Sequence, residues 1–301
     1  MGRLPGPSFN TFTPYEESLE KEAALEHLTK GGRYDVVVHI GGMAIGLRTD
    51  NPSFLRILEE RYGSFLSSSA RPDFEFEIDL VPPGKISADE DVRVFHNSGR
   101  WWIERGDFRA EWDPALGRGR IRQSTNPYSI DSVLRIVHTL LLARSGGFLA
   151  HAASAVRNGR AFLFAGRSGA GKTTISGLAP PDVRLLTDEV SYVRPQGAEG
   201  SRAPGGYLAF GTPFAGELAR VGENLSAPVA ALYLLAKGPE NRLEAVGPAE
   251  AGRALLENIL FFAEDPELVN LVFQSACEFV SRVTVRRLVF VPDSRVWEMI
   301  G

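Results

Sequence analysis

The chain has 301 residues, of which 44% are hydrophobic and 23% are charged, and its formal net charge at pH 7 is −4. This composition is typical of a globular protein with a sizeable core, and the acidic balance excludes a general affinity for nucleic acid or acidic membrane surfaces. The single cysteine, Cys277, excludes an internal disulfide, and no apolar run reaches the roughly 18 residues that a membrane-spanning helix requires. We therefore expect a cytoplasmic protein whose partners include neither nucleic acid nor membrane.

The first part of the chain consists of an expected lead-in and a strand-rich region. Residues 1–30 begin with a Pro-, Gly- and Ser-rich stretch without the apolar segment of a signal peptide, and we expect a flexible lead-in. In residues 74–80, Phe, Ile and Leu alternate with Glu and Asp, which is typical of a half-buried strand. Similar short runs follow, so we expect residues 31–126 to form a β-rich N-terminal region. Residues 127–301 are expected to form a second domain.

This second domain is expected to begin with an amphipathic helix. Apolar side chains recur at helical spacing from Ile130 to Leu141, and Gly146-Gly147 follows as a stop signal. His138 lies within this helix, and we expect it to be packed in the core rather than to take part in chemistry.

A hairpin is expected directly after this helix. The segment before Asn158-Gly159 has the composition of a strand, and Asn-Gly is a preferred two-residue turn of type I′. Such a turn pairs Arg157 with Arg160, and the same register places His151 opposite Gly166. The strand that leads into Gly166 then has an antiparallel neighbour, whereas most nucleotide-binding α/β sheets have parallel ones. The register therefore aims His151 at the segment that begins with Gly166.

Residues 166–173 match the complete phosphate-binding pattern Gly-x-x-x-x-Gly-Lys-[Ser/Thr]. In this pattern the glycines let backbone N–H groups point inward at an anion, the lysine reaches the β- and γ-phosphates, and the hydroxyl binds Mg²⁺. An apolar run at 161–165 and a helix-compatible run at 174–178 supply the strand–loop–helix context that the pattern requires. We therefore expect ATP and Mg²⁺ as cofactors. The candidate nucleotide-binding residues are Gly166, Arg167, Ser168, Gly169, Ala170, Gly171, Lys172, Thr173 and Thr174.

Two adjacent acids, Asp188 and Glu189, follow the next expected strand, which only one short helix separates from Lys172. Ligand sites of open α/β sheets lie at such strand ends. One carboxylate can hold Mg²⁺ while the other accepts the proton of a hydroxyl nucleophile. The alternative is that one acid caps a loop and only the other has a functional role. Further along, residues 211–217 form either a loop over the acceptor site or a plain turn, and Glu217 is the substrate-site candidate there.

The layout of His151, the glycine-rich motif and the Asp188-Glu189 pair resembles the C-terminal domain of HPr kinase/phosphorylase and, more closely, the wider group of HPr-kinase-related proteins. The resemblance covers about residues 127–300. It implies that Asp188 takes the proton from the acceptor hydroxyl, that Glu189 helps to hold Mg²⁺, and that His151 lies beside the transferring phosphoryl group. The second acid is Glu where HPr kinase has Asp, and the Pro-Gly-Arg-Asn stretch of that kinase has no match. We therefore do not expect HPr itself as the substrate.

Together, the motifs and the resemblance predict a fold and a set of roles. We expect an α/β fold with a phosphate-binding-loop (P-loop) core like that of HPr kinase and phosphoenolpyruvate carboxykinase. Its sheet is expected to be mixed, with an antiparallel strand beside the strand of the loop, and the β-rich N-terminal region is added to this core. The catalytic candidates are Asp188, His151 and Lys172, and the metal candidates are Thr173, Glu189 and Asp188.

The expected function is an ATP- and Mg²⁺-dependent kinase that transfers the γ-phosphoryl group to a hydroxyl of a peptide, a protein or a small molecule. The alternative is a nucleotide-binding regulatory or scaffold protein that transfers nothing. The sequence leaves open the identity of the acceptor, the preference for ATP or GTP, any phosphorylase activity and the formation of a homo-oligomer.

Overall fold

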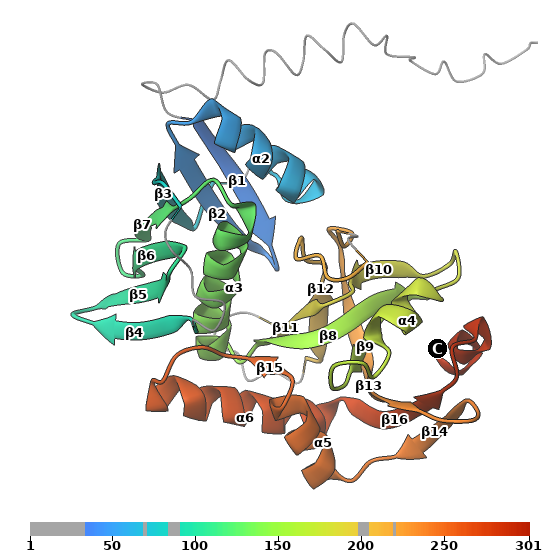
Figure 1. The fold of residues 1–301 in the computed structure, drawn as a ribbon. Helices are drawn as coiled ribbons and strands as arrows, with labels where there is room; N and C mark the ends of the chain where they lie inside the picture. Colours follow the sequence, from blue (N-terminus) through green and yellow to red (C-terminus); the bar gives the residue numbers. More distant parts are fainter. Residues whose placement is uncertain (1–33, 69–70, 84–90, 198–204, 219–220) are drawn as a thin grey trace, which may run out of the picture.

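The computed structural model describes residues 34–68, 71–83, 91–197, 205–218 and 221–301. Strands make up 40% and helices 28% of these residues. The strands form two sheets, and a long helix lies between them (Figure 1). The expected lead-in at residues 1–30 lies outside the described residues.

The N-terminal sheet has seven strands in the order β1-β2-β3-β7-β6-β5-β4. Strand β3 runs parallel to β2 and β7, and the remaining pairs are antiparallel. The predicted alternation is confirmed in β3, where Phe76 and Ile78 are buried and Asp79 is exposed. The strands are β1 (Tyr34–Ile40), β2 (Met43–Thr49), β3 (Phe74–Leu80), β4 (Arg93–Asn97), β5 (Arg100–Arg105), β6 (Phe108–Asp113) and β7 (Arg118–Gln123).

The long central helix, α3 (Pro127–Arg144), joins the two sheets. It begins after Asn126, whose side chain accepts a hydrogen bond from the Tyr128 N–H at 3.0 Å and caps the helix. One continuous core contains the apolar face of α3, the inner face of the N-terminal sheet and part of the second sheet. His138 is fully buried in this core against the ring of Tyr192, at 5.4 Å between ring centroids, so the prediction that it is packed is confirmed.

The second sheet has nine strands, and five of them close into a ring. Strand β8 pairs with β9 and β11, β11 with β12, β12 with β13, and β13 returns to β9. Only the β9–β13 pair of this ring is parallel. The strands are β8 (Phe148–Arg157), β9 (Arg160–Ala165), β10 (Arg184–Thr187), β11 (Val190–Pro195), β12 (Tyr207–Phe210), β13 (Ser226–Lys237), β14 (Arg242–Ala245), β15 (Ile259–Leu260) and β16 (Thr284–Phe290).

The expected α/β fold class, with a P-loop kinase core, is wrong. The glycine-rich motif lies in a β-rich structure that contains a closed five-strand barrel and mixed sheets. The physical reason lies in the connections, because a parallel α/β sheet needs a crossover helix between successive strands. Here β9 is followed by a helix of only six residues, and most neighbours in the ring are antiparallel. The motif determines its own local context, but it does not determine how distant strands pair.

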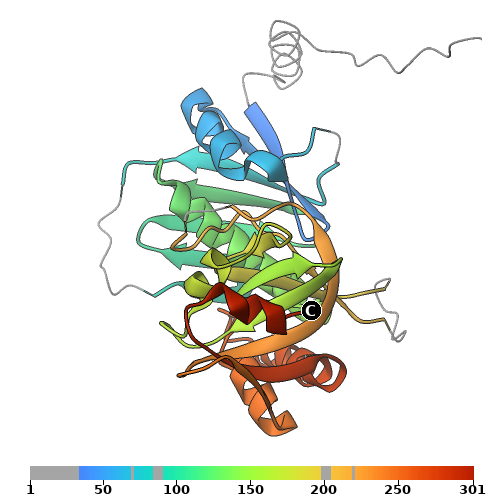
Figure 2. The same ribbon diagram turned by 90° about the vertical axis from the view of Figure 1, so that its right-hand side faces the viewer.

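Further helices complete the described structure. They are α2 (Pro52–Tyr62), α4 (Lys172–Gly177), α5 (Pro248–Leu256), α6 (Pro266–Arg282) and the short 3₁₀ helices at Gly63–Phe65 and Ser294–Met299. Figure 2 shows the two sheets one above the other, with α5 and α6 at the end of the molecule opposite α2. None of the helices in the described ranges has the length and apolar character needed to cross a membrane.

Candidate functional site

The glycine-rich segment forms a tight loop between β9 and α4, as the motif predicts. Strand β9 ends at Ala165 and α4 begins at Lys172, with Gly171 as its N-cap. Gly171 has a φ of +112°, and a Cβ at this position would lie 2.6 Å from Cζ of Phe290. Both the backbone angle and the close approach therefore require glycine. The backbone angle and the packing of Phe290 from β16 thus explain the second glycine of the motif.

Lys172 folds back across the loop. Its Nζ donates a hydrogen bond to the carbonyl oxygen of Gly166 at 2.8 Å, and the side chain is buried. Burial lowers the pKa of Lys172 from its ordinary value, and the negative charges of Glu189 and Glu217 oppose that shift. Two carboxylates are therefore close enough to act on this ammonium group electrostatically.

The predicted hairpin register is confirmed. Arg157 pairs with Arg160, and the ladder runs without a shift to the pair of Ala152 and Ala165. His151 is the next residue of β8, where it pairs with Val190 of β11. Its backbone N–H donates to the carbonyl oxygen of Asn258 at 2.7 Å.

His151 is half-buried and lies within electrostatic reach of the glycine-rich loop. Burial lowers the pKa of its imidazole below the usual value of 6.5, and the cations Lys172 and Arg135 lower it further, while Glu189 acts in the opposite direction. The ring is therefore neutral at pH 7, with one nitrogen as a donor and the other as an acceptor.

The adjacent acids Asp188 and Glu189 form a two-residue bend between β10 and β11, which follow one another along the same partner strand, β8. The hydroxyl of Thr187 accepts hydrogen bonds from the Glu189 N–H at 3.2 Å and from the Val190 N–H at 3.1 Å, which stabilises the bend. Consecutive side chains along an extended segment point to opposite faces, so the two acids have different surroundings.

Asp188 faces the segment at 211–218 instead of the lysine. Its side chain is only 3% exposed. Oδ1 accepts a hydrogen bond from the Gly216 N–H at 2.8 Å, and Oδ2 accepts one from the Leu218 N–H at 2.9 Å. Both carboxylate oxygens thus hold the backbone on either side of Glu217.

Glu189 and Glu217 act on Lys172, and a third acid, Glu257, forms an ion pair of 3.8 Å with Arg167 of the same loop. Glu189 is half-buried, and its charge acts on both Lys172 and His151. Glu217 is exposed, and its Oε2 accepts a hydrogen bond from the Thr173 hydroxyl at 3.1 Å. The structure therefore brings Glu217, for which the sequence signal was weak, directly onto the motif.

The donor set at this loop consists of hard oxygen atoms. Thr173, Glu189 and Glu217 supply a hydroxyl and two carboxylates, which are ligands that Mg²⁺ prefers. Within the described ranges, no group of three or more His, Cys, Asp or Glu side chains is arranged to hold a metal ion. A magnesium ion would therefore complete its coordination with water and with phosphate oxygens of a nucleotide, which is how Mg²⁺ is usually bound.

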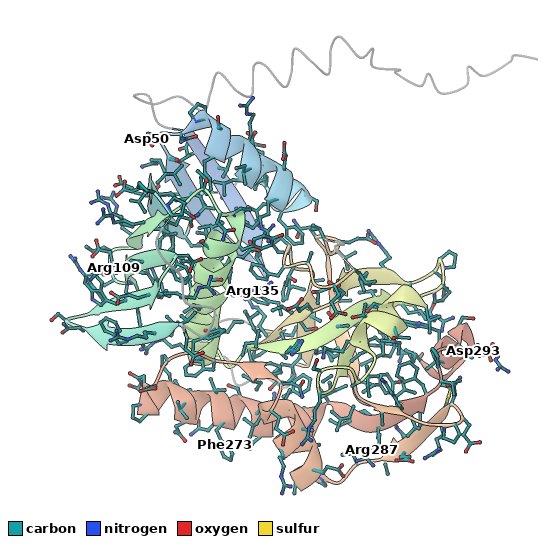
Figure 3. All side chains as sticks on the ribbon, viewed as in Figure 1. Asp50, Arg109, Arg135, Phe273, Arg287 and Asp293 are labelled. Atoms are coloured by element: carbon teal, nitrogen blue, oxygen red, sulfur yellow. The ribbon has the colours of Figure 1, made fainter. Side chains whose placement is uncertain are left out.

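Sequence reasoning missed Arg135, which projects from α3 between this helix and the second sheet (Figure 3). Its Cζ lies 4.9 Å from the ring centroid of Phe214, in the same segment that carries Glu217. Its Nε is buried and has no hydrogen-bond partner. An arginine on an amphipathic helix carries no functional signal by itself, so only the tertiary structure identifies it.

Comparison with known proteins places this site within a family. A family model described as SynChlorMet cassette protein ScmC matches residues 122–301. A search of curated proteins finds no match. The matched segment covers more than half of the chain and includes α3, the five-strand ring and every candidate site residue named above. The chain therefore belongs to the ScmC family of SynChlorMet cassette proteins.

Proposed function

We propose that this protein is an ATP- and Mg²⁺-dependent kinase that transfers the γ-phosphoryl group of ATP to a hydroxyl of a peptide, a protein or a small molecule. One observation carries the proposal. The glycine-rich loop is surrounded by a lysine, a hydroxyl, a neutral histidine and two acids, contributed by separate elements. A cytoplasmic setting, where ATP is available, belongs to the same proposal.

Lys172 and Thr173 bind the nucleotide in this proposal. The inward N–H groups of the glycine-rich loop and the ammonium group of Lys172 stabilise the negative charge of the β- and γ-phosphates. Thr173 and Glu217, which already share a hydrogen bond, would hold Mg²⁺ directly or through water. The bound ion would neutralise charge on the phosphates as the phosphoryl group moves.

Glu189 is the better placed general base. As the acceptor oxygen forms its bond to the γ-phosphorus and the bond to the ADP oxygen breaks, the hydroxyl proton passes to a carboxylate of the protein. The resemblance assigns this role to Asp188. Asp188 is almost fully buried, and each of its oxygens already accepts a backbone hydrogen bond. Its role in the present proposal is to hold the segment that carries Glu217.

His151 is proposed to lie beside the transferring group as a neutral donor. Its lowered pKa favours the uncharged ring at pH 7, which orients a phosphoryl oxygen through an N–H instead of competing with Mg²⁺ for the phosphate oxygens as a second cation. Positioning and electrostatic stabilisation of this kind account for most of the rate enhancement in phosphoryl transfer.

The proposal is tested with the purified chain, γ-labelled ATP, Mg²⁺ and a panel of hydroxyl-bearing peptides, proteins and small molecules. We expect transfer of the label that depends on Mg²⁺ and is lost in Lys172→Met. Binding of one nucleotide per chain with no transfer to any acceptor and no hydrolysis would contradict the kinase. That outcome would favour the nucleotide-binding regulatory protein.

A further inference from the structure

Arg135 is held in place by an aromatic ring. Its guanidinium lies over the ring of Phe214, with 4.9 Å between Cζ and the ring centroid. Phe214 is fully buried, so the ring is a rigid support. A guanidinium stacked on an aromatic face keeps its edge N–H groups free to bind a planar or tetrahedral anion.

The charge of Arg135 is not compensated by a neighbouring acid. Among the residues that the structure describes, no carboxylate forms an ion pair with it, and its buried Nε has no hydrogen-bond partner. Asp131, one turn earlier on α3, is already occupied, because it accepts hydrogen bonds from the Arg61 Nε–H at 2.9 Å and the Tyr62 hydroxyl at 2.8 Å. A half-buried cation with an unsatisfied N–H favours a bound anion.

A continuous chain of contacts connects Arg135 to β8, the strand that carries His151. The Thr212 hydroxyl donates to the carbonyl oxygen of Val190 at 3.0 Å, and Val190 pairs with His151 across β11 and β8. Phe214 follows Thr212 by two residues, and the Arg135 guanidinium lies over its ring. The positive charges of Lys172 and Arg135 both lower the pKa of His151, which agrees with an imidazole that lies within reach of both cations.

We infer that Arg135 and His151 form an anion subsite that binds the γ-phosphoryl group of the nucleotide and so distinguishes a triphosphate from a diphosphate. This inference rests on the proposed function, because it deepens the description of the same site. Lys172 lies on the loop itself, with its Nζ on the carbonyl of Gly166, where the motif holds the β-phosphate. His151 and Arg135 would hold the γ-phosphoryl group, which lies beyond the β-phosphate in a nucleotide. An arginine supplied by the same chain is a known means of stabilising a transferring phosphoryl group.

The test compares the binding of ADP and of the non-hydrolysable analogue AMP-PNP, each with Mg²⁺, by calorimetry on the full chain. The variants are Arg135→Ala, Arg135→Gln, which retains part of the packing on Phe214, and Arg135→Lys, which retains the charge. The control is Arg144→Ala, an exposed arginine in the last turn of the same helix. Loss of a charge-assisted hydrogen bond corresponds to roughly a 10- to 100-fold loss of affinity.

We expect Arg135→Ala and Arg135→Gln to lower the affinity for AMP-PNP by that factor. Their affinity for ADP should stay within about twofold of the wild-type value. Arg135→Lys should recover part of the loss, and Arg144→Ala should change neither affinity. If Arg135→Ala does not fold, Arg135→Gln carries the test. Equal losses for both nucleotides, or no loss for either, would overturn the subsite.

The two proposals fail in different ways. Affinities for AMP-PNP and ADP that are the same in every Arg135 variant as in the wild type would overturn the subsite and leave the kinase standing. Selective loss of AMP-PNP in the Arg135 variants, combined with no transfer in the wild type, would support the subsite and overturn the kinase. A wild-type chain that binds neither nucleotide would overturn both.

Discussion

Asp188 holds Gly216 by a hydrogen bond of 2.8 Å from the glycine N–H to Oδ1. The second oxygen of the same carboxylate accepts the Leu218 N–H, so the backbone on both sides of Glu217 is fixed. The Glu217 side chain then meets the Thr173 hydroxyl on the glycine-rich loop. Through these contacts the bend after β10 determines where an acid on a distant segment lies. The roles of Asp188 and Glu189 can be separated by experiment on this basis.

Asp188→Asn should loosen the segment at 211–218. An asparagine keeps one acceptor oxygen, but its amide group places a donor against a backbone donor. A buried N–H group that loses its partner costs about 1–3 kcal/mol in the free energy of unfolding. We expect a loss of that size in urea unfolding and faster hydrogen exchange at the Gly216 and Leu218 amides. The matched control is Asp182→Asn, an exposed carboxylate paired with Arg157, which should change little. Unchanged exchange at both amides would contradict the role of Asp188.

Glu189→Gln should remove the general base. Loss of general base catalysis lowers the rate of transfer by roughly 100- to 10,000-fold. Nucleotide affinity should change much less, because the loop and Lys172 remain. Glu240→Gln, an exposed acid in the connection from β13 to β14, is the control and should transfer at the wild-type rate. A transfer rate in Glu189→Gln equal to that of the wild type would contradict its role as the base.

Gly216→Ala should disturb the two acids together. A Cβ at this position would lie 2.5 Å from Oε2 of Glu189 and 3.0 Å from Oδ2 of Asp188, so the segment must shift. Overpacking of this kind costs about 1–3 kcal/mol in the free energy of unfolding, and transfer should fall with it. Gly177→Ala is the control, because a Cβ there would meet no atom within 4 Å. Equal stability and activity of the two variants would contradict the close approach.

The free energy of unfolding should decrease as the pH falls, because of His138. Burial lowers the pKa of this imidazole from 6.5 to about 3. Between these two values the unfolded chain binds a proton that the folded chain does not, so the free energy of unfolding decreases as the pH falls from about 6.5, with a slope of at most about 1.4 kcal/mol per pH unit. His138→Leu should flatten the pH dependence in urea unfolding between pH 7 and pH 4.5. The same slope in the variant and the wild type would contradict this origin.

The sequence predicted the local structure of the site well. The Asn158-Gly159 turn determined the register of β8 and β9, and the motif predicted strand, loop and short helix in the right places. It also predicted two acids at the end of the next strand. These features depend on neighbouring residues, where turn chemistry and glycine geometry are decisive.

The sequence could not predict the parts that depend on remote contacts. The pairing of β9 with β13, which closes the ring, joins strands with about 60 residues between them and leaves no local signal. The fold class was wrong for this reason. Asp188 differs from Glu189 because it binds the backbone of a remote segment at Gly216 and Leu218, and Arg135 joins the site only because α3 packs beside Phe214.

Single-turnover transfer from γ-labelled ATP is the most direct test of the central claim, which is that this site moves a phosphoryl group to a hydroxyl. The account predicts that label appears on a hydroxyl acceptor with wild-type protein and Mg²⁺, and that it disappears in Lys172→Met and in Glu189→Gln. Tight binding of Mg²⁺–ATP by the wild type, with all of the label still in ATP at the end of the reaction, would contradict it.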